Sequence, residues 1–220
     1  MKLFPAETSL VVAGAWNPAI LTPAWVARHG LGADPETVKV QAFLPAVSGF
    51  QVGAPKFGLT EFSYTVAGGS LLLLPAAIDE ASLDLLERVL RGVLDQLRHT
   101  PLGGLGHNFE FRDEAPEPAT VEAFTLARRD LVNHMPAGWA PASTDIAATF
   151  ANEAGTVLIN VQRHFDASGS TIRFNFHHPA STVEEALNLL AGQGGYKRMH
   201  ENLQFAHRLV RELFGEVINA

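Results

Sequence analysis

The chain has 220 residues, of which 47% are hydrophobic and 18% are charged, and its formal net charge is −7. This size and composition allow a buried core, in one large domain or two small ones. The acidic balance disfavours binding to nucleic acid, because a polyanion would be repelled. Cysteine is absent, which excludes disulfides, thiolate nucleophiles and cysteine-ligated zinc.

Membrane insertion is not expected, because no segment approaches the roughly 18 consecutive apolar residues that a spanning helix needs. The N-terminal apolar run over residues 10–15 is too short for the core of a signal peptide. The cytoplasm is therefore the default expectation for the location of the protein.

The first elements alternate between strand and helix. Residues 10–14 are an apolar run typical of a buried strand. Thr22 followed by Pro23 predicts the start of a short helix over residues 24–29, because Thr caps helices and Pro suits the first helical position. Residues 38–44 alternate apolar and polar side chains, which indicates a second strand.

A β-hairpin is predicted next, because residues 61–66 and 71–74 flank Gly68 and Gly69. A tight turn needs positive φ angles, which glycine adopts at little cost. Pairing across this turn places five apolar residues on one face: Phe62, Tyr64, Val66, Leu71 and Leu73.

A helix is predicted from Asp79 to Pro101, with leucines and valines at helical spacing, and a strand follows over residues 105–112. The acidic, proline-containing segment 113–118 is the best boundary between two halves. A second helix is expected after it, capped by Thr120 and stopped by Pro136. Its inward residues are expected to be Val121, Phe124, Leu131 and Met135.

Three hairpin-connected strands are predicted over residues 145–151, 156–165 and 171–178. In the register that their turns imply, the apolar residues of all three strands share one face, and a slip of one residue would scatter them. That face is expected to hold Ile146, Ala148, Phe150, Val157, Ile159, Val161, Phe165, Ile172, Phe174 and Phe176.

The opposite face of these strands is polar, with Asn160, Gln162 and His164 opposite His177, Asn175 and Arg173. Side chains that both donate and accept hydrogen bonds gather here, where solvated sheets more often carry Thr, Lys and Glu. The face is interpreted as a hydrogen-bonding floor for a polar ligand or as a wet interface with a partner. A plain solvated sheet face is the alternative.

The last third of the chain predicts a helix starting at a capping box, Ser181 to Glu184, and ending before residues 192–195. A long final helix then carries an apolar stripe with coiled-coil spacing. It is interpreted as lying across the three-stranded sheet, with pairing to a second copy of the chain as the alternative. The stripe consists of Tyr196, Met199, Leu203, Ala206, Val210, Leu213 and Val217.

The segment 192–198 is the best candidate for anion binding, because a glycine-rich bend leads into a helix N-terminus that carries Lys197 and Arg198. A hinge between two helices is the alternative. No catalytic constellation is found: His107 and Glu110 lie three apart on a strand and face opposite sides, and no serine has the spacing of a nucleophile elbow.

The predicted fold is α+β, with antiparallel sheets of hairpin-connected strands covered by helices, and one curved sheet as the alternative. A short similarity in sequence between residues 69–79 and 169–182 suggests two pseudo-repeated halves, 1–113 and 119–220, within one compact unit.

Three functions are weighed. The first is a non-catalytic binding or assembly protein that acts through protein–protein contacts, is expected to be a homodimer and needs no cofactor. The second is a binding protein or enzyme for a small anionic ligand, using a cavity between the C-terminal sheet and the long helix. Its ligand contacts are expected from Arg173, Asn175, His177, Asn160, Gln162, Lys197 and Arg198. The third is a metal site drawn from His164, His177, His178 and His200.

Overall fold

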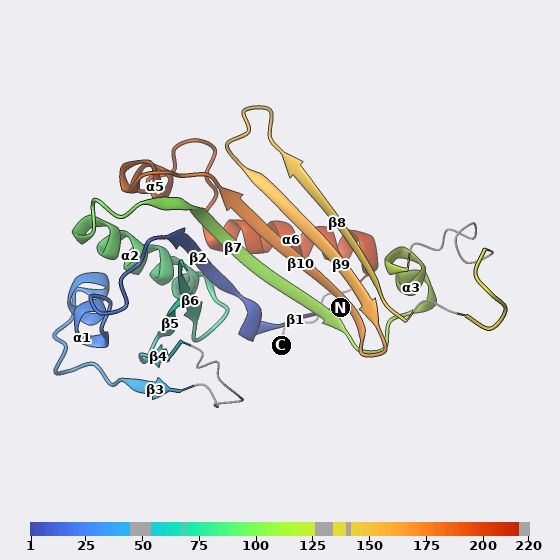
Figure 1. Ribbon diagram of the computed structural model, residues 1–220, viewed down its shortest axis with the longest axis horizontal. Helices are drawn as coiled ribbons and strands as arrows, with labels where there is room; N and C mark the ends of the chain where they lie inside the picture. Colours follow the sequence, from blue (N-terminus) through green and yellow to red (C-terminus); the bar gives the residue numbers. More distant parts are fainter. Residues whose placement is uncertain (45–53, 68, 126–133, 140–141, 216–220) are drawn as a thin grey trace.

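The computed structural model describes residues 1–44, 54–67, 69–125, 134–139 and 142–215. These residues form an α+β fold, as predicted, built on one antiparallel sheet of ten strands. The strand order is β3-β4-β5-β6-β2-β7-β10-β9-β8, and β1 also pairs with β7. Strands from both predicted halves therefore belong to one continuous sheet (Figure 1).

The strands are β1 (Lys2–Leu3), β2 (Ser9–Gly14), β3 (Gln41–Phe43), β4 (Lys56–Gly58), β5 (Phe62–Ala67), β6 (Ser70–Pro75), β7 (Leu102–Asp113), β8 (Thr144–Ala151), β9 (Leu158–Asp166) and β10 (Gly169–His178). The helices are α1 (Pro23–Val26), α2 (Glu80–Gln96), α3 (Pro118–Phe124), α5 (Val183–Leu190) and α6 (Met199–Phe214), with short helical turns at Pro5–Glu7 and Ala27–Leu31. In these residues no helix is both long and apolar enough to cross a membrane.

Helices α2, α5 and α6 cover one face of the sheet, and α6 passes behind β10 and β9 in the view of Figure 1. The core lies between these helices and the strands. Phe174 and Phe176 of β10 are 1% and 2% exposed, and Met199 and Val210 of α6 are fully buried. The prediction that the apolar stripe of the last helix packs on the sheet is confirmed, although Leu213 in that stripe is exposed and residue 217 lies outside the described residues.

The predicted facing of the side chains on the three C-terminal strands is confirmed, because the Phe174 and Phe176 side chains are buried while Arg173 is exposed. The predicted pairing between β9 and β10 is wrong by two residues, because Asp166 pairs with Gly169 across a two-residue turn. On the polar face Asn160 pairs with Asn175, and Gln162 pairs with Arg173. His177 and His164 pair across with Leu158 and Thr171.

One part of the apolar-face prediction is wrong. Phe150 of β8 is 59% exposed and Ala148 is also exposed. The helical layer over β10 therefore leaves the outermost strand uncovered. Alternation along a strand predicts which face a side chain points to, but at the edge of a sheet it does not predict that the side chain is buried.

The hairpin of β5 and β6 forms as predicted, with Tyr64 opposite Leu73 and both side chains buried. Helix α2 begins after Asp79, whose side chain accepts a hydrogen bond from the Ser82 N–H. It ends at Gln96, before the predicted Pro101.

The helix predicted after the 113–118 segment differs in detail. Glu117 is its N-cap, in place of Thr120, because Pro118 takes the first helical position. Met135 is 45% exposed and does not point inward. Residue 131 lies outside the described residues.

Helix α5 begins one residue later than predicted, because its capping box is formed by Thr182 and Glu185 and not by Ser181 and Glu184. Helix α6 begins at Met199, and Tyr196 is buried in the loop before it. The two similar segments, in β6 and β10, both lead into helices on the covered face; the duplication itself stays a prediction.

Candidate functional site

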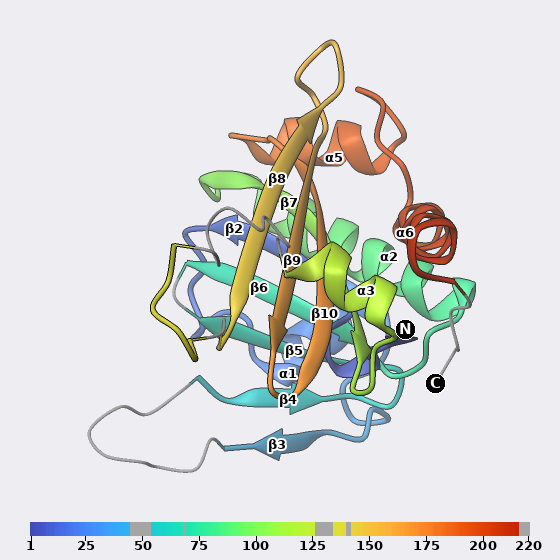
Figure 2. The same cartoon turned by 90° about the vertical axis from the view of Figure 1, so that its right-hand side faces the viewer.

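The open face is the side of β2, β7, β10, β9 and β8 that α2, α5 and α6 do not cover (Figure 2). Alternate residues of each strand point to it, because side chains on a strand alternate between faces. On β10 these residues are Thr171, Arg173, Asn175 and His177, while Ile172, Phe174 and Phe176 point into the core. The polar side chains of five strands therefore share one surface.

A row of hydrogen bonds, here called the amide ladder, crosses these five strands. Asn108 Nδ2 donates to Ser9 Oγ at 3.2 Å, and Asn175 Nδ2 donates to Asn108 Oδ1 at 2.7 Å. Asn160 Nδ2 donates to Asn175 Oδ1 at 3.0 Å, and Thr149 Oγ1 donates to Asn160 Oδ1 at 2.7 Å. Each asparagine thus donates to one neighbour and accepts from the other.

The amide ladder fixes the orientation of its side chains before any ligand arrives. An asparagine has two N–H donors and one carbonyl acceptor with two lone pairs, so each ladder amide keeps hydrogen-bonding capacity after its ladder bonds are made. A surface of fixed amides loses less side-chain entropy on binding than a surface of free ones. The predicted hydrogen-bonding floor is therefore present as a preorganised surface.

Beside the ladder, one buried carboxylate holds two arginines. Glu110 is 2% exposed, and its Oε2 accepts a hydrogen bond from Arg173 Nε at 2.5 Å, while its Oε1 accepts from Arg112 Nε. The Arg112 guanidinium lies over the Phe4 ring at 3.5 Å. Arg173 remains half exposed and uses Nε for Glu110, so its terminal N–H groups can still contact a ligand.

A hollow of about 680 Å³ lies on the open face over the ladder. Leu72 and Leu74 of β6 form one wall, and Ala147 and Thr149 of β8 form another. The curved sheet thus brings β6 and β8, which have four strands between them, toward one hollow. Four of the seven predicted ligand-binding residues line it: Arg173, Asn175, Asn160 and Gln162.

The other three predicted residues lie elsewhere. His177 is on the open face but does not line the hollow. Its ring packs so closely on Gly104 that a Cβ added to that glycine would lie 2.5 Å from it. Burial lowers the pKa of His177. Lys197 and Arg198 precede α6, on the covered side of the sheet. The seven residues do not form one site, and the space between the sheet and α6 is filled by core side chains.

The predicted anion site before α6 is occupied by a carboxylate of the protein itself. Glu87 of α2 is 5% exposed, and its Oε1 accepts hydrogen bonds from the Met199 N–H at 2.8 Å and from Tyr196 Oη at 2.7 Å. Arg198 Nε donates to Glu87 Oε2 at 3.2 Å. The helix N-terminus and the cation do attract an anion, and that anion is Glu87.

The contacts of Glu87 continue into a buried network of Glu87, Tyr196, His107 and Asn202. The Tyr196 hydroxyl lies 3.0 Å from His107 Nε2, and Asn202 Nδ2 lies 2.9 Å from His107 Nδ1. Burial lowers the pKa of His107 to about 3, and burial together with the Glu87 charge raises the pKa of Tyr196. The sequence analysis did not predict this network. His107 alternates along β7 with Phe109 and Phe111, and that pattern places it on the core side of the strand.

His178 lies beside this network, with its ring centroid 4.7 Å from that of Tyr196. Burial lowers the pKa of His178 to about 4, and neither ring nitrogen has a hydrogen-bond partner among the described residues. A neutral imidazole is therefore held in the core.

The four histidines weighed as a metal site do not meet. His177 and His178 are consecutive on β10 and point to opposite faces. His164 lies on the open face, where Nδ1 is 2.9 Å from Asp145 and Nε2 is 3.2 Å from Asp166. These hydrogen bonds raise the pKa of His164.

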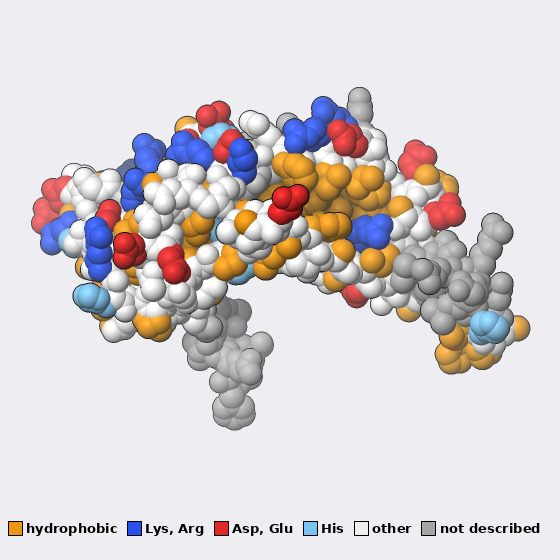
Figure 3. Space-filling view, turned by 90° about the horizontal axis from the view of Figure 1, so that it is seen from above, with side chains coloured by type: hydrophobic (Ala, Val, Ile, Leu, Met, Phe, Trp, Pro, Cys, Tyr) orange, Lys and Arg blue, Asp and Glu red, His pale blue; other side chains and the backbone are white. Residues whose placement is uncertain are grey.

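Strand β8 ends the sheet, so one of its edges has no neighbouring strand in the described part of the chain. It is eight residues long, whereas β3 at the other end of the sheet has three. Seen from above, apolar side chains gather on the side of the molecule where the β8–β9 hairpin lies (Figure 3). Phe150 is the large hydrophobic residue that β8 exposes.

No family model matches the chain, and no curated protein matches it. Among solved structures, one similar chain is described as "Crystal structure of the di-domain ARO/CYC StfQ from the steffimycin biosynthetic pathway". The alignment covers 93% of each chain at 10% sequence identity, with a TM-score of 0.17. A likeness at that level supports no statement about the function of this chain.

Proposed function

We propose that this protein is a non-catalytic binding protein that assembles with a second copy of itself along strand β8. The observation that carries the proposal is the long edge of β8, with its exposed Phe150. An edge strand presents unpaired backbone N–H and C=O groups, which are a template for pairing with another chain.

The sequence of β8 lacks the features that protect an edge strand. Natural edges are shielded by lysine, proline or bulges, or by being very short. Strand β8 contains neither lysine nor proline, and Asp145 is its one charged residue. β3, at the opposite end of the sheet, is protected by its shortness.

Antiparallel pairing about a two-fold axis would make the contact self-complementary. With Ala148 at the axis, Phe150 of one copy lies opposite Ile146 of the other. Both residues lie on the side of β8 opposite the open face, where the helical layer does not reach. Cross-strand pairs of an aromatic and a β-branched residue stabilise a sheet by roughly 0.2–1 kcal/mol each. The pairing also continues the open face from one copy into the next, beside the hollow.

Sedimentation velocity over a wide concentration range tests the proposal. The wild-type chain is expected to show a monomer–dimer equilibrium, and Phe150→Lys is expected to raise its dissociation constant by about tenfold or more, a loss of about 1.4 kcal/mol. Leu213→Lys is the matched control, because Leu213 is also 59% exposed and lies on α6.

The absence of cysteine allows a second test of the same contact. Ala148→Cys introduces one thiol at the proposed axis, and mild oxidation is expected to give a disulfide-linked dimer. A monomer at every concentration would exclude this assembly. So would a control variant that dissociates as readily as Phe150→Lys.

A second candidate function is the binding of a small anionic ligand in the hollow. Arg173 favours it, because its guanidinium is fixed through Nε and half exposed beside fixed amides. Bidentate recognition of carboxylate or phosphate is the usual role of such an arginine.

Two-dimensional NMR titration with inorganic phosphate and with citrate tests this candidate. Shifts are expected at Asn160, Asn175 and Gln162, and Arg173→Gln should abolish them. Arg208→Gln on α6 is the control for loss of a positive charge. Shifts that persist in Arg173→Gln would exclude the hollow as the site.

A further inference from the structure

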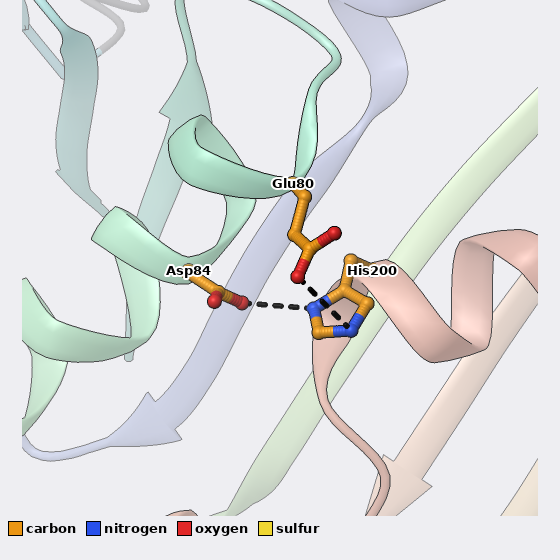
Figure 4. A group of neighbouring side chains, drawn as sticks. All are labelled: Glu80, Asp84 and His200. Atoms are coloured by element: carbon orange, nitrogen blue, oxygen red, sulfur yellow. Dashed lines mark hydrogen bonds and ion pairs between the residues drawn. The ribbon is translucent and has the colours of Figure 1, made fainter.

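We infer that Glu80, Asp84 and His200 form a binding site for a divalent transition-metal ion of the Zn²⁺ type, where α2 and α6 meet. These residues bring three potential ligand atoms within 4.8 Å of one another (Figure 4). The site is separate from the open face and from the edge of β8. It does not depend on the proposed function.

The geometry follows from the two helices. Glu80 and Asp84 are four residues apart on α2, so both carboxylates lie on the same side of that helix. His200 is the second residue of α6 and points toward them (Figure 4). Its Nδ1 is 2.9 Å from Asp84 Oδ1, and its Nε2 is 4.0 Å from Glu80 Oε1.

These three donors match the chemistry of Zn²⁺ and its neighbours in the first transition row. Carboxylate oxygen and imidazole nitrogen bind Zn²⁺ at about 2.0–2.2 Å. Donor atoms within 4.8 Å of one another can reach those lengths with small side-chain movements. Glu80 can make the largest one, because its side chain is 70% exposed, and water would complete the coordination.

Asp84 is held in place by a second contact. Its Oδ2 lies 3.2 Å from Arg198 Nη1, so Oδ1, which faces His200 Nδ1, is the oxygen that would bind the ion. Carboxylate ligands of metal ions are commonly oriented by such an outer hydrogen bond. Asp84 and His200 are 21% and 16% exposed, so their positions are also fixed by packing.

The site offers a dication two anionic ligands. Glu80 and Asp84 bring two carboxylates to it, and the Arg198 guanidinium that contacts Asp84 is shared with Glu87. The N-termini of α2 and α6 add about half a positive charge each. These helix ends and Arg198 offset part of the carboxylate charge, and an imidazole binds a metal through an unprotonated ring nitrogen.

Isothermal titration of the untagged, chelator-treated full chain with Zn²⁺ tests the inference. One ion per chain is expected, and Zn²⁺ should raise the melting temperature, because an ion that binds the folded chain shifts the unfolding equilibrium. With Co²⁺, visible absorption should report nitrogen and oxygen ligands. His200→Ala should weaken binding by at least about tenfold.

Two variants make the result decisive. Glu80→Gln removes a ligand from an exposed side chain, so it should weaken Zn²⁺ binding without affecting the fold, even if His200→Ala unfolds the chain. His164→Ala is the matched control, because His164 also contacts two carboxylates, Asp145 and Asp166. Absent Zn²⁺ binding, or binding unchanged by Glu80→Gln and His200→Ala, would overturn the inference.

Discussion

The two sides of strand β7 carry similar polar groups with different consequences. His107 points into the core, where Tyr196 and Asn202 occupy both of its ring nitrogens. Its neighbour Asn108 points to the open face and belongs to the amide ladder. The inward groups join α2 and α6 to the sheet, whereas the outward groups form a fixed, accessible surface. On this strand burial, and not residue type, decides whether a polar group serves stability or recognition.

The strongest test of this contrast is Glu87→Ala. The change leaves the Met199 N–H, the Tyr196 hydroxyl and Arg198 without their shared acceptor. Breaking a buried charged contact of this kind costs about 3–5 kcal/mol. Urea unfolding should show that loss as a lower free energy of unfolding. A cost below about 1 kcal/mol would mean that the buried network does not hold α6 in place.

The second test is pH, because burial lowers the pKa of His107 to about 3 and of His178 to about 4. Below about pH 6.5 the unfolded chain binds protons that the folded chain does not, so the free energy of unfolding decreases as the pH is lowered. Between pH 7 and pH 5 the expected loss is about 2 kcal/mol for each of the two histidines.

Unfolding measured at both pH values in the wild type and in His178→Phe checks this expectation. The variant should lose less stability on acidification than the wild type. The partly exposed His164 gives the opposite sign, because its pKa is raised: its contribution to stability is complete below about pH 6.5 and is lost as pH rises. Equal acid sensitivity of wild type and His178→Phe would contradict a neutral, buried His178.

The third test compares two asparagines. Asn202→Ala leaves the buried His107 without a hydrogen bond at Nδ1, which should cost about 1–3 kcal/mol. Asn175→Ala breaks two bonds of the amide ladder, but water can replace them, so about 0.5–1.5 kcal/mol is expected. Chemical unfolding of both variants checks the order. The reverse order would mean that the ladder is structural and not primarily a binding surface.

Much of the fold could be predicted from the sequence, because the patterns that define its elements are local. Three predictions depend on neighbouring residues alone: the inward facing of Phe174 and Phe176, the pairing of β5 with β6, and the cap at Thr22. The structure confirms all three. The polar face of β9 and β10 follows from the same facing of the side chains. Four of the predicted residues consequently lie in one hollow.

The remaining features depend on contacts between distant residues. Glu87 and Met199 are 112 positions apart, so nothing in the glycine-rich bend shows that its anion is already supplied. Similarly, the exposure of Phe150 depends on how far the helical layer extends over β8, and not on the pattern of β8 itself. Residues 192–198 therefore have the features of a ligand site but serve an internal contact.

The position of β7 has a consequence during protein synthesis. One side of β7 pairs with β1 and β2, which the ribosome has already made, and the other side pairs with β10, which follows about fifty residues later. At about 5–20 residues per second, this edge of the nascent chain stays unpaired for several seconds. During that time Phe109 and Phe111 also lack their ring contacts with Phe176 and Phe174 of β10. Newly made chains are therefore most open to aggregation, and to chaperone binding, before β10 emerges.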